Sequence, residues 1–326
     1  MSKTHIIKWC HALSLFALVL FFHALVMAAT QDLSPAPTSD WPWWVWPLLL
    51  FVFCFVLGIV AVLAGVGGGV LYVPLVGGFF PFHIDFVRGA GLMVALAGAL
   101  AAGPGLLRRN LASIRLALPV ALIASACSIV GALLGLYLSK LNPNIVQVCL
   151  GTTIFGIAIL LLFSKNTEKP VVTKQDAIGL ALNIHGCYLD EATQEIVHWK
   201  THHTLLGLVM FIFIGVLAGM FGLGAGWANV PVLNLLMGAP LKISVATSKF
   251  LLSITDTSAA WIYFNKGCVI PLIAIPSIVG LMFGSFVGVK LLSIVKAKFI
   301  RYIVIAVLLF AGLKAIDKGL GIGILG

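Results

Sequence analysis

Charged residues are scarce in this sequence. Only 9% of its 326 residues are Asp, Glu, Lys or Arg, whereas 61% are hydrophobic, and the mean hydropathy is +1.14. Soluble domains carry about 25% charged residues, so this chain has too little polar surface to cover a particle in water. The composition therefore excludes an ordinary soluble enzyme and predicts a protein solvated by a lipid bilayer.

Several motifs of soluble and catalytic proteins are also missing. The sequence contains no GxxxxGK[ST] phosphate-binding loop, no HExxH motif and no GxSxG motif. Its six cysteines form no CxxC pair, and all but Cys187 lie in or beside apolar stretches, where they act as small hydrophobic side chains. These absences argue against an ATP-driven pump and against an intramembrane hydrolase.

The net charge of +10 does not indicate nucleic-acid binding in this chain. The 20 Lys and Arg residues fall mainly in short segments between apolar stretches. Basic residues distributed in this way are topology signals of a multi-pass membrane protein.

The chain divides into two predicted transmembrane units with flanking segments. Residues 1–29 are typical of both a transmembrane anchor and a cleaved signal segment. Residues 30–42 form an external linker that leads into a tryptophan cluster typical of a membrane interface. We expect transmembrane units at 43–163 and 204–318, followed by a tail at 319–326.

Most apolar stretches in the two units approach the roughly 20 residues that a membrane-crossing helix needs. The exceptions are 70–80 and 227–238, which are clearly shorter, and each of them follows a glycine cluster. The segment 63–75 matches 220–232 at a constant shift of 157 residues, with Pro74 corresponding to Pro231. The chain therefore contains an internal repeat.

The basic residues indicate how the two repeats are oriented. If every short stretch completes a crossing, each half crosses the membrane five times and the second half enters from the opposite side. A cytoplasmic N-terminus then places most basic clusters inside, namely Arg108/Arg109/Arg115, Lys165/Lys169/Lys174/Lys200 and Lys290/Lys296/Lys298/Arg301. If the short stretches return to their side of entry, the first two clusters lie outside. The pattern favours an all-α polytopic membrane protein with two inverted-topology repeats and glycine-interrupted helices, broken or re-entrant.

The polar stretch 164–203 between the halves is predicted to be a cytoplasmic loop. Within it, residues 186–199 alternate about a turn at 190–194, which is typical of a β-hairpin. Its histidines and Cys187 have no zinc-site spacing, so we expect a solvated hairpin without metal.

The two glycine clusters are the best candidates for a binding site. Glycine-interrupted helices at matching positions of two repeats mark the site of many transporters, and half-helix N-termini suit an anion. The alternative is close packing of unbroken helices through small residues. Two clusters in register, each ahead of a Val-Pro, favour the break at Gly67, Gly68, Gly69, Gly222, Gly224 and Gly226.

Ionisable residues occur inside one otherwise apolar stretch of the second half. Lys249, Ser253 and Asp256 share one helix face, and charges at membrane depth by default mark a pathway or a partner. Lys249 could instead extend to the cytoplasmic interface, while the short Asp256 side chain favours a functional role. Asp85 and Arg88, three residues apart, are interpreted as a surface pair near the end of a span.

These motifs resemble the TauE/SafE family of sulfite exporters over about residues 50–317. The glycine-rich break and Val-Pro occur twice, and Ala239-Pro-Leu-Lys-Ile-Ser-Val-Ala-Thr-Ser248 follows the second. The resemblance implies an inner-membrane carrier of small anions such as sulfite and sulfonates, without cofactor or covalent catalysis. The family motif matches this sequence at the glycine turns and at the Thr-Ser pair, Thr247 and Ser248. The first half departs from the pattern with Arg88 and Gly89 in place of a Thr-Ser pair.

The sequence therefore predicts a multi-pass secondary transporter that exports small anions, above all sulfite or organosulfur compounds. Its partners are the substrate and the bilayer, without nucleic acid. An intramembrane enzyme and a structural membrane protein without transport are the alternatives. The predicted substrate site comprises the six glycines named above with Asn229, Thr247, Ser248 and Lys249, and Asp256 couples transport to protons or charge.

Overall fold

The computed structural model describes residues 42, 44–64, 67–80, 82–108, 112–163, 170, 172, 175–190, 195–291 and 297–321. The predicted N-terminal segment 1–29, nearly all of the linker 30–42, and residues 322–326 of the tail lie outside them. Within this part of the chain, six helices are long and apolar enough to cross a membrane. The predicted all-α polytopic membrane protein is confirmed.

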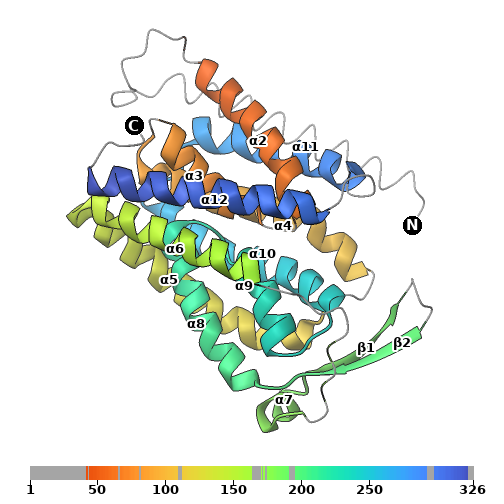
Figure 1. The fold of residues 1–326 in the computed structure, drawn as a ribbon. Helices are drawn as coiled ribbons and strands as arrows, with labels where there is room; N and C mark the ends of the chain where they lie inside the picture. Colours follow the sequence, from red (N-terminus) through yellow and green to blue (C-terminus); the bar gives the residue numbers. More distant parts are fainter. Residues whose placement is uncertain are drawn as a thin grey trace.

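The same order of helices occurs in both halves (Figure 1). The first half contains α2 (Val45–Ala64), α3 (Gly68–Phe79), α4 (Ile84–Arg108), α5 (Ile114–Leu141) and α6 (Pro143–Phe163). The second contains α8 (Thr204–Phe221), α9 (Gly226–Pro231) with the π-helix η1 (Val232–Leu236), α10 (Leu241–Asn265), α11 (Pro271–Leu291) and α12 (Ala297–Leu320). Each half thus begins with an interrupted helix and continues with three long ones.

Local sequence signals explain several of these boundaries. Pro143 and Pro271 occupy the first positions of α6 and α11, where a missing N–H costs nothing. Ser113 caps α5, because its hydroxyl accepts a hydrogen bond from the Leu116 N–H at 3.4 Å.

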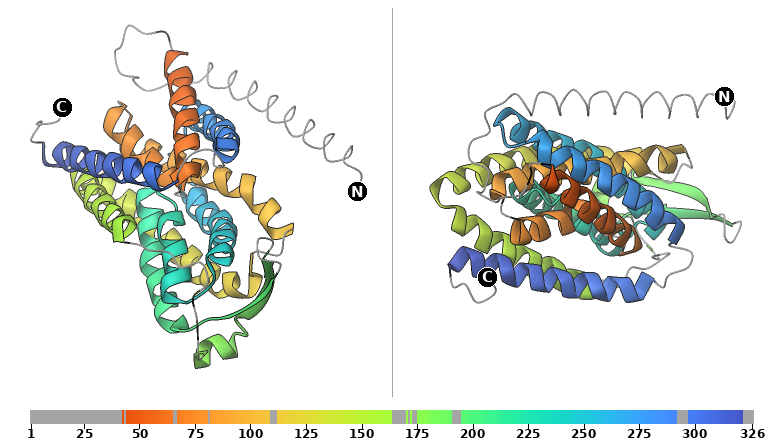
Figure 2. Two further views of the ribbon diagram at one scale, coloured as in Figure 1. Left: turned by 45° about the vertical axis from the view of Figure 1, so that its right-hand side comes forward. Right: turned by 90° about the horizontal axis from the view of Figure 1, so that it is seen from above.

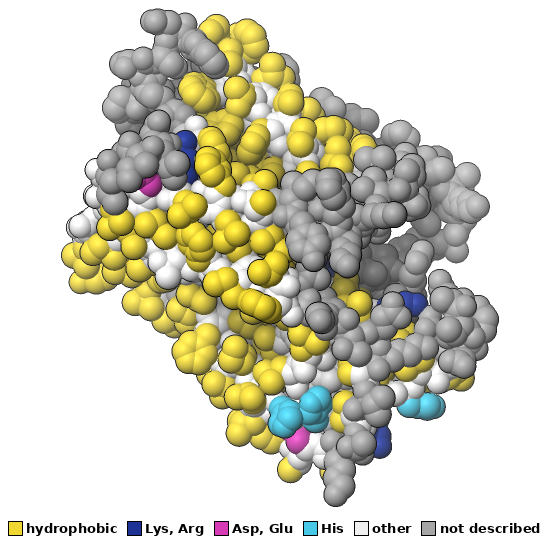
Figure 3. All heavy atoms as spheres, in the orientation of Figure 1, with side chains coloured by type: hydrophobic (Ala, Val, Ile, Leu, Met, Phe, Trp, Pro, Cys, Tyr) yellow, Lys and Arg dark blue, Asp and Glu magenta, His cyan; other side chains and the backbone are white. Residues whose placement is uncertain are grey.

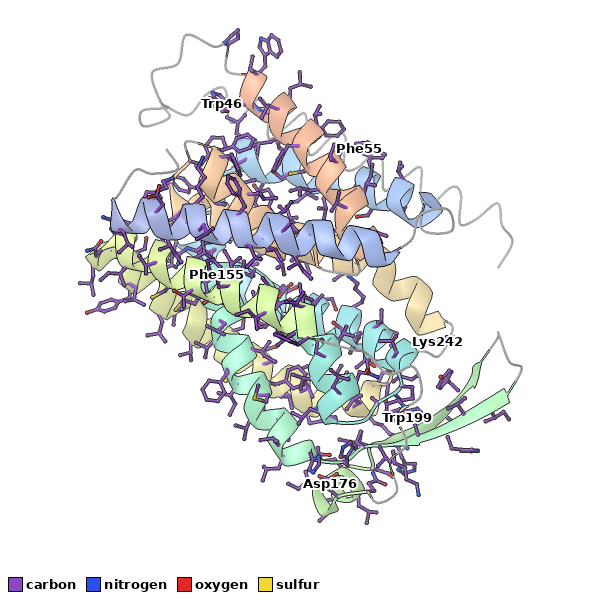
Figure 4. The ribbon with its side chains drawn as sticks, in the orientation of Figure 1. Trp46, Phe55, Phe155, Asp176, Trp199 and Lys242 are labelled. Atoms are coloured by element: carbon purple, nitrogen blue, oxygen red, sulfur yellow. The ribbon has the colours of Figure 1, made fainter. Side chains whose placement is uncertain are left out.

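A small polar unit connects the two halves. It contains α7 (Ala177–Ala181) and the antiparallel strands β1 (His185–Asp190) and β2 (Glu195–Lys200), with His185 opposite Lys200. The strands fall in the stretch for which a hairpin is predicted, although residues 191–194 of its turn lie outside the described part. The ribbon projects from one end of the bundle, where Asp176 and Trp199 are labelled in Figure 4.

Asp176 ties this unit to the first helix of the second half. Its carboxylate accepts hydrogen bonds from the Thr204 N–H at 3.0 Å and from the Thr204 hydroxyl at 2.8 Å. A carboxylate at a helix N-terminus satisfies free N–H groups and stabilises the helix dipole. No group of three or more His, Cys, Asp or Glu side chains suited to a metal occurs among the described residues.

The helices of the two halves interlock rather than forming two separate bundles (Figure 2). Helix α2 packs against α11, and the repeat-related α8 packs against α5. Helices α4 and α10, which correspond to each other, also pack together, as do α6 and α12. The helix contacts of one half therefore recur in the other.

Close approaches of glycine show the relative direction of the packed helices. Gly280, Gly284 and Gly288 of α11 approach, in this order, the carbonyl groups of Phe51, Phe55 and Ile59 of α2. Helices α2 and α11 therefore run in the same direction. Small residues at such contacts let helix backbones approach closely inside a membrane.

The equivalent pair α5 and α8 also runs in one direction. Gly215 and Gly219 of α8 meet Ala124 and Ser128 of α5 in the same order. Gly131 of α5 meets Val216 of α8. At the 157-residue shift Gly131 corresponds to Gly288 and Val216 to Ile59, so this contact is the repeat-related equivalent of the Gly288–Ile59 contact.

Helices α6 and α12 run in opposite directions. Gly151 meets Ile316, whereas Gly319 approaches Asn144 near the start of α6. Residue numbers at the contacts thus increase along α12 as they decrease along α6.

The outer face of the bundle is apolar (Figure 3). Hydrophobic side chains cover much of the face drawn there. The large exposed hydrophobic residues of the protein include Leu122 (73% exposed) and Phe163 (75% exposed). In water this exposure would be unfavourable, but lipid tails solvate it. Histidine side chains gather near α7, at the end of the bundle that carries the ribbon.

Candidate functional site

Both glycine clusters interrupt a helix, and the two interruptions touch. Helix α2 ends at Ala64 and α3 begins at Gly68, while α8 ends at Phe221 and α9 begins at Gly226. A Cβ atom added to Gly226 would lie only 3.5 Å from the Cα atom of Gly67. The alternative of two unbroken helices packed through small residues does not hold, because both breaks are present.

The second break depends on two glycines with left-handed backbone conformations. Gly222 has φ of 69° and caps the C-terminus of α8, and Gly224 has φ of 68°. Only glycine adopts such angles without steric cost, which explains why glycines recur here. The chain then turns back into α9 and continues through η1, and π-helical turns are frequent at functional sites.

Asp256 of α10 lies beside this second break. Its side chain is completely buried, and a Cβ atom at Gly224 would lie 3.0 Å from its Oδ2 atom. Oδ1 accepts a weak hydrogen bond from the Thr255 hydroxyl at 3.4 Å, whereas Oδ2 has no hydrogen-bond partner within the described part of the chain. A buried carboxyl oxygen without a partner is costly, which marks it as a candidate for binding a proton or a ligand.

The register between α9 and α10 extends the site away from Asp256. Gly224 meets Asp256, and Gly226 meets Leu252 at 3.2 Å, so the chain from the break through α9 runs antiparallel to α10. Asn229, three residues further along α9, and Lys249, three residues before Leu252 in α10, both lie on the side of this contact that is away from Asp256. The half-buried Lys249 lies on the same face of α10 as Leu252 and Asp256.

Asn229 of α9 is another buried polar residue whose side chain lacks a partner in the described part of the chain. Its side chain is 1% exposed, and neither Oδ1 nor Nδ2 has a hydrogen-bond partner among the residues that the structure describes. An amide can donate and accept at once, so this side chain has the capacity to contact a polar ligand.

The remaining predicted site residues divide into two groups. Gly69 approaches the Leu223 carbonyl oxygen, with 2.6 Å between that atom and an added Cβ, so it belongs to the contact between the breaks. Gly68 instead packs on Leu281 of α11, and Gly222 packs on the backbone of Arg88. Thr247 and Ser248 are buried, and the Thr247 hydroxyl accepts a hydrogen bond from the Ser113 N–H at 3.1 Å. Thr247 thus contacts the start of α5.

The interpretation of Asp85 and Arg88 as a surface pair is wrong. Arg88 is completely buried and forms an ion pair with Asp85, whose side chain is 16% exposed. Its Nη1 donates to the Met220 carbonyl at 2.8 Å, and its guanidinium lies 5.8 Å from the centre of the Tyr263 ring. The i, i+3 spacing correctly indicates the pair, but only tertiary packing shows that α5, α8 and α10 enclose it.

Tyr72 is a buried polar residue that sequence reasoning missed. It corresponds to Asn229 at the 157-residue shift, and its hydroxyl lies 3.1 Å from the Ser277 hydroxyl of α11. The first half therefore satisfies its polar group at this position, whereas the Asn229 amide has no partner among the residues that the structure describes. A residue-by-residue alignment of the two repeats pairs Tyr72 with Asn229 and so indicates this position from sequence.

The site combines the ammonium group of Lys249, the Asn229 amide, which has no partner in the described part of the chain, and the buried carboxyl group of Asp256. Lys249 and Asn229 can donate hydrogen bonds to an anion, while Asp256 can hold or release a proton. About 10 Å of helix rise separates Lys249 from Asp256, and Leu252, which packs against Gly226, lies between them on the same face of α10.

Comparison with known proteins agrees with the resemblance seen in the sequence. Over 281 residues, the chain is 25% identical to "Probable membrane transporter protein YunE" of Bacillus subtilis, which covers 84% of this chain and 98% of that protein. It is 30% identical over 111 residues to "Probable membrane transporter protein YdhB" of the same organism, covering 33% of this chain and 44% of that protein. No solved structure was found to match.

A family model described as "Sulfite exporter TauE/SafE" matches residues 50–315 and so includes both glycine breaks, Asn229, Lys249 and Asp256. Since the match extends over most of the chain and both repeats, this protein belongs to the TauE/SafE family.

Proposed function

We propose that this protein is a secondary transporter of small anions, and that it exports sulfite or organosulfur compounds such as sulfonates across the inner cell membrane. The observation that carries the proposal is the contact between the two helix breaks, with the buried Asp256 beside the second. Broken helices that meet inside the membrane are typical of transporter binding sites. Family membership and the names of the two relatives support the same class.

In the proposed mechanism, Lys249 and Asn229 bind the anion, and Asp256 exchanges a proton or balances charge during the cycle. The glycines Gly67, Gly69, Gly224 and Gly226 let the breaks approach each other and keep backbone groups accessible to the substrate. Thr247 and Ser248, next to Lys249 in α10, add hydroxyl groups at the end where α10 begins. Transport of this kind needs no cofactor and no catalytic residue.

We infer that the two halves are inverted repeats. The Tyr263 hydroxyl, near the end of α10, donates to the Gly219 and Met220 carbonyls at 3.1 Å, near the end of α8, so α8 and α10 run in one direction. Helix α11 returns after residues 266–270, and α2 runs with α11. Helices α2 and α8, the first of each half, therefore have opposite directions, which supports inverted topology.

Cysteine labelling in intact cells checks this topology. In a variant without native cysteines, single cysteines at 142 and 266 are expected to react with a membrane-impermeant thiol reagent, because the positive-inside rule places them outside. Cysteines at 109 and 185 are expected to react only after permeabilisation. Labelling of 109 and 185 in intact cells would instead support parallel repeats.

Anion flux in proteoliposomes tests the transport function. We expect sulfite or a sulfonate to be transported, and Lys249→Met to raise its KM about 10- to 100-fold. Loss of a hydrogen bond to a charged group costs about 1.5–3 kcal/mol, which corresponds to this change in affinity. Lys242→Met is the matched control, since Lys242 is an exposed lysine at the start of the same helix (Figure 4).

The same measurement separates the alternatives. An intramembrane enzyme would convert the substrate chemically, and a structural protein would produce no flux of any anion tested. Equal effects of the Lys249 and Lys242 substitutions would exclude Lys249 from the binding site.

A further inference from the structure

The buried ion pair of Asp85 and Arg88 joins four helices at one end of the bundle. Arg88 of α4 donates to the Met220 carbonyl of α8 at 2.8 Å and to the Gly135 carbonyl of α5 at 3.4 Å, and it lies over Tyr263 of α10. The Ser139 hydroxyl of α5 donates to the other carboxylate oxygen of Asp85 at 3.0 Å. We call this cluster the Arg88 end.

The cluster holds the end of α8 that leads into the second break. Met220 lies two residues before the left-handed Gly222, and its carbonyl accepts from both Arg88 and the Tyr263 hydroxyl. A Cβ atom at Gly222 would overlap the Arg88 backbone. Any movement of the break relative to α4 must therefore disrupt the Arg88 contacts.

The cluster also lies between the break and the surface of the bundle. Arg88 is fully buried, Asp85 is 16% exposed, and the His83 side chain, 3.7 Å from the Asp85 carboxylate, is 53% exposed. Next to Arg88, Gly89 packs tightly against the Cys268 carbonyl group in the loop between α10 and α11. The Arg88 end thus closes this side of the bundle with charged groups.

The repeat-related position at the opposite end has different chemistry. Between Pro81 and Pro240 the shift is 159 residues, so Arg88 corresponds to Thr247 and Asp85 to Ser244. The Thr247 hydroxyl accepts from the Ser113 N–H at 3.1 Å, and the Ser244 hydroxyl donates to the Ala239 carbonyl at 3.2 Å. We call this cluster, where α10 begins, the Thr247 end.

The two ends differ in what opening requires. Separating a buried ion pair leaves an uncompensated charge in a low-dielectric environment. A neutral hydroxyl that loses its partner can bond to incoming water at little cost. Opening the Arg88 end therefore costs more free energy than opening the repeat-related Thr247 end.

We propose that Arg88 and Asp85 are positioning residues that keep the Arg88 end closed, so that the resting protein opens its central site at the Thr247 end. This inference rests on the proposed transport function and adds a gate and a resting orientation to it. Arg88 acts through the α8 break rather than by touching the substrate.

Side-specific labelling of one reporter cysteine tests the proposal. In a variant without native cysteines, Ala225→Cys places a thiol in the second break, where the native side chain is 1% exposed. An impermeant thiol reagent is applied to vesicles from either side. We expect the reporter to react at least about tenfold faster from the Thr247 end, as expected for a resting preference of about 1.4 kcal/mol or more.

Substitutions at the two ends should change this preference in opposite ways. Asp85→Asn and Arg88→Met are expected to raise labelling from the Arg88 end at least about tenfold, and Arg88→Lys should have a smaller effect because it can still pair with Asp85. Thr247→Val is the matched substitution, and it should raise labelling only from the Thr247 end. Ser139→Ala removes one Asp85 contact and serves as a milder variant if Arg88→Met does not fold.

Melting temperatures measured beside the labelling rates separate gating from a merely structural role. The proposal is overturned if folded Asp85→Asn and Ser139→Ala proteins keep the native labelling rates from both sides, or if the parent protein reacts faster from the Arg88 end. Labelling needs no substrate, so its outcome is independent of the flux measurement. If the predicted side preference is found but no anion is transported, the proposed transport function is contradicted, whereas the gate is not.

Discussion

Replacing Asp256 by Asn is expected to abolish anion transport driven by a pH gradient while leaving the protein folded. Asp256 is the completely buried carboxyl group beside the second helix break, and its Oδ2 atom lacks a partner among the described residues. Asparagine keeps the size and polarity of the side chain but cannot bind or release a proton. If Asp256 couples the proton to the anion, coupling is lost although the anion still binds.

The measurement pairs flux with stability. Uptake or efflux is followed in proteoliposomes with an imposed pH gradient, and anion exchange at equal pH on both sides is followed in the same preparation. We expect exchange to persist in Asp256→Asn and gradient-driven accumulation to disappear, with a small change in melting temperature. Full gradient-driven transport in this variant would remove Asp256 from the mechanism and leave Lys249 and the helix-break amides as candidates.

Asp176→Asn provides a matched control with the opposite expectation. Asp176 lies outside the membrane-spanning helices and accepts two hydrogen bonds from Thr204 at the start of α8. Its substitution removes a negative charge from the start of α8, which costs about 0.3–1 kcal/mol, but removes no group from the proposed pathway. Lower stability with intact coupling in Asp176→Asn, and the reverse in Asp256→Asn, would separate the two roles.

The features that sequence alone predicts are those with a local cause. Glycines in register ahead of Val-Pro identify the two breaks, and at the second break a φ of 69° at Gly222 and of 68° at Gly224 restricts the residue type. Span length and hydropathy predict the membrane helices, because lipid leaves the backbone few other ways to satisfy its hydrogen bonds.

The features that sequence misses depend on which helix faces which. The buried state of Arg88 depends on α5, α8 and α10, which lie far away in the chain, while the spacing from Asp85 looks the same in a surface pair. Gly68 and Gly69 are neighbours, but one packs on α11 and the other on the second break. No periodicity of α3 alone distinguishes the two sides, since Tyr72 is its one polar side chain and the other residues are glycine or apolar.

The hydrogen bonding of the Asn229 amide is another feature that the sequence does not predict. The sequence shows a polar residue at position 229, and the repeat aligns it with Tyr72. Whether such a group finds a partner depends on the helix that faces it: α11 supplies Ser277 to Tyr72, whereas no described residue pairs with the Asn229 amide. The two repeats therefore share a fold but differ in the hydrogen bonding of this polar position within the described residues.

Replacing Gly222 by Ala is expected to destabilise the protein strongly and to eliminate transport. The residue has φ of 69°, and an added Cβ atom would overlap the Arg88 carbonyl and lie 2.7 Å from the Arg88 Cα. The left-handed conformation costs a non-glycine residue about 1–2 kcal/mol. Overpacking against backbone adds about 1–3 kcal/mol and must displace the α8 break from α4.

Two other glycines separate these effects. Gly267 has the same φ of 69° in the loop after α10, but no atom lies within 4 Å of an added Cβ. Gly267→Ala should therefore show the conformational cost alone and keep transport. Gly156 in α6 also has open space around it and a helical conformation, so Gly156→Ala should be neutral or stabilise by up to about 1 kcal/mol.

Thermal unfolding of the purified variants, measured beside anion flux, gives the order to be checked. We expect Gly156→Ala to be the most stable, Gly267→Ala intermediate, and Gly222→Ala the least stable and inactive. Equal stability of Gly222→Ala and Gly267→Ala would mean that the break can move away from α4 at no cost. The Arg88 contacts would then not hold α8 in place, and both the close packing at Gly222 and the gate inferred from it would have to be given up.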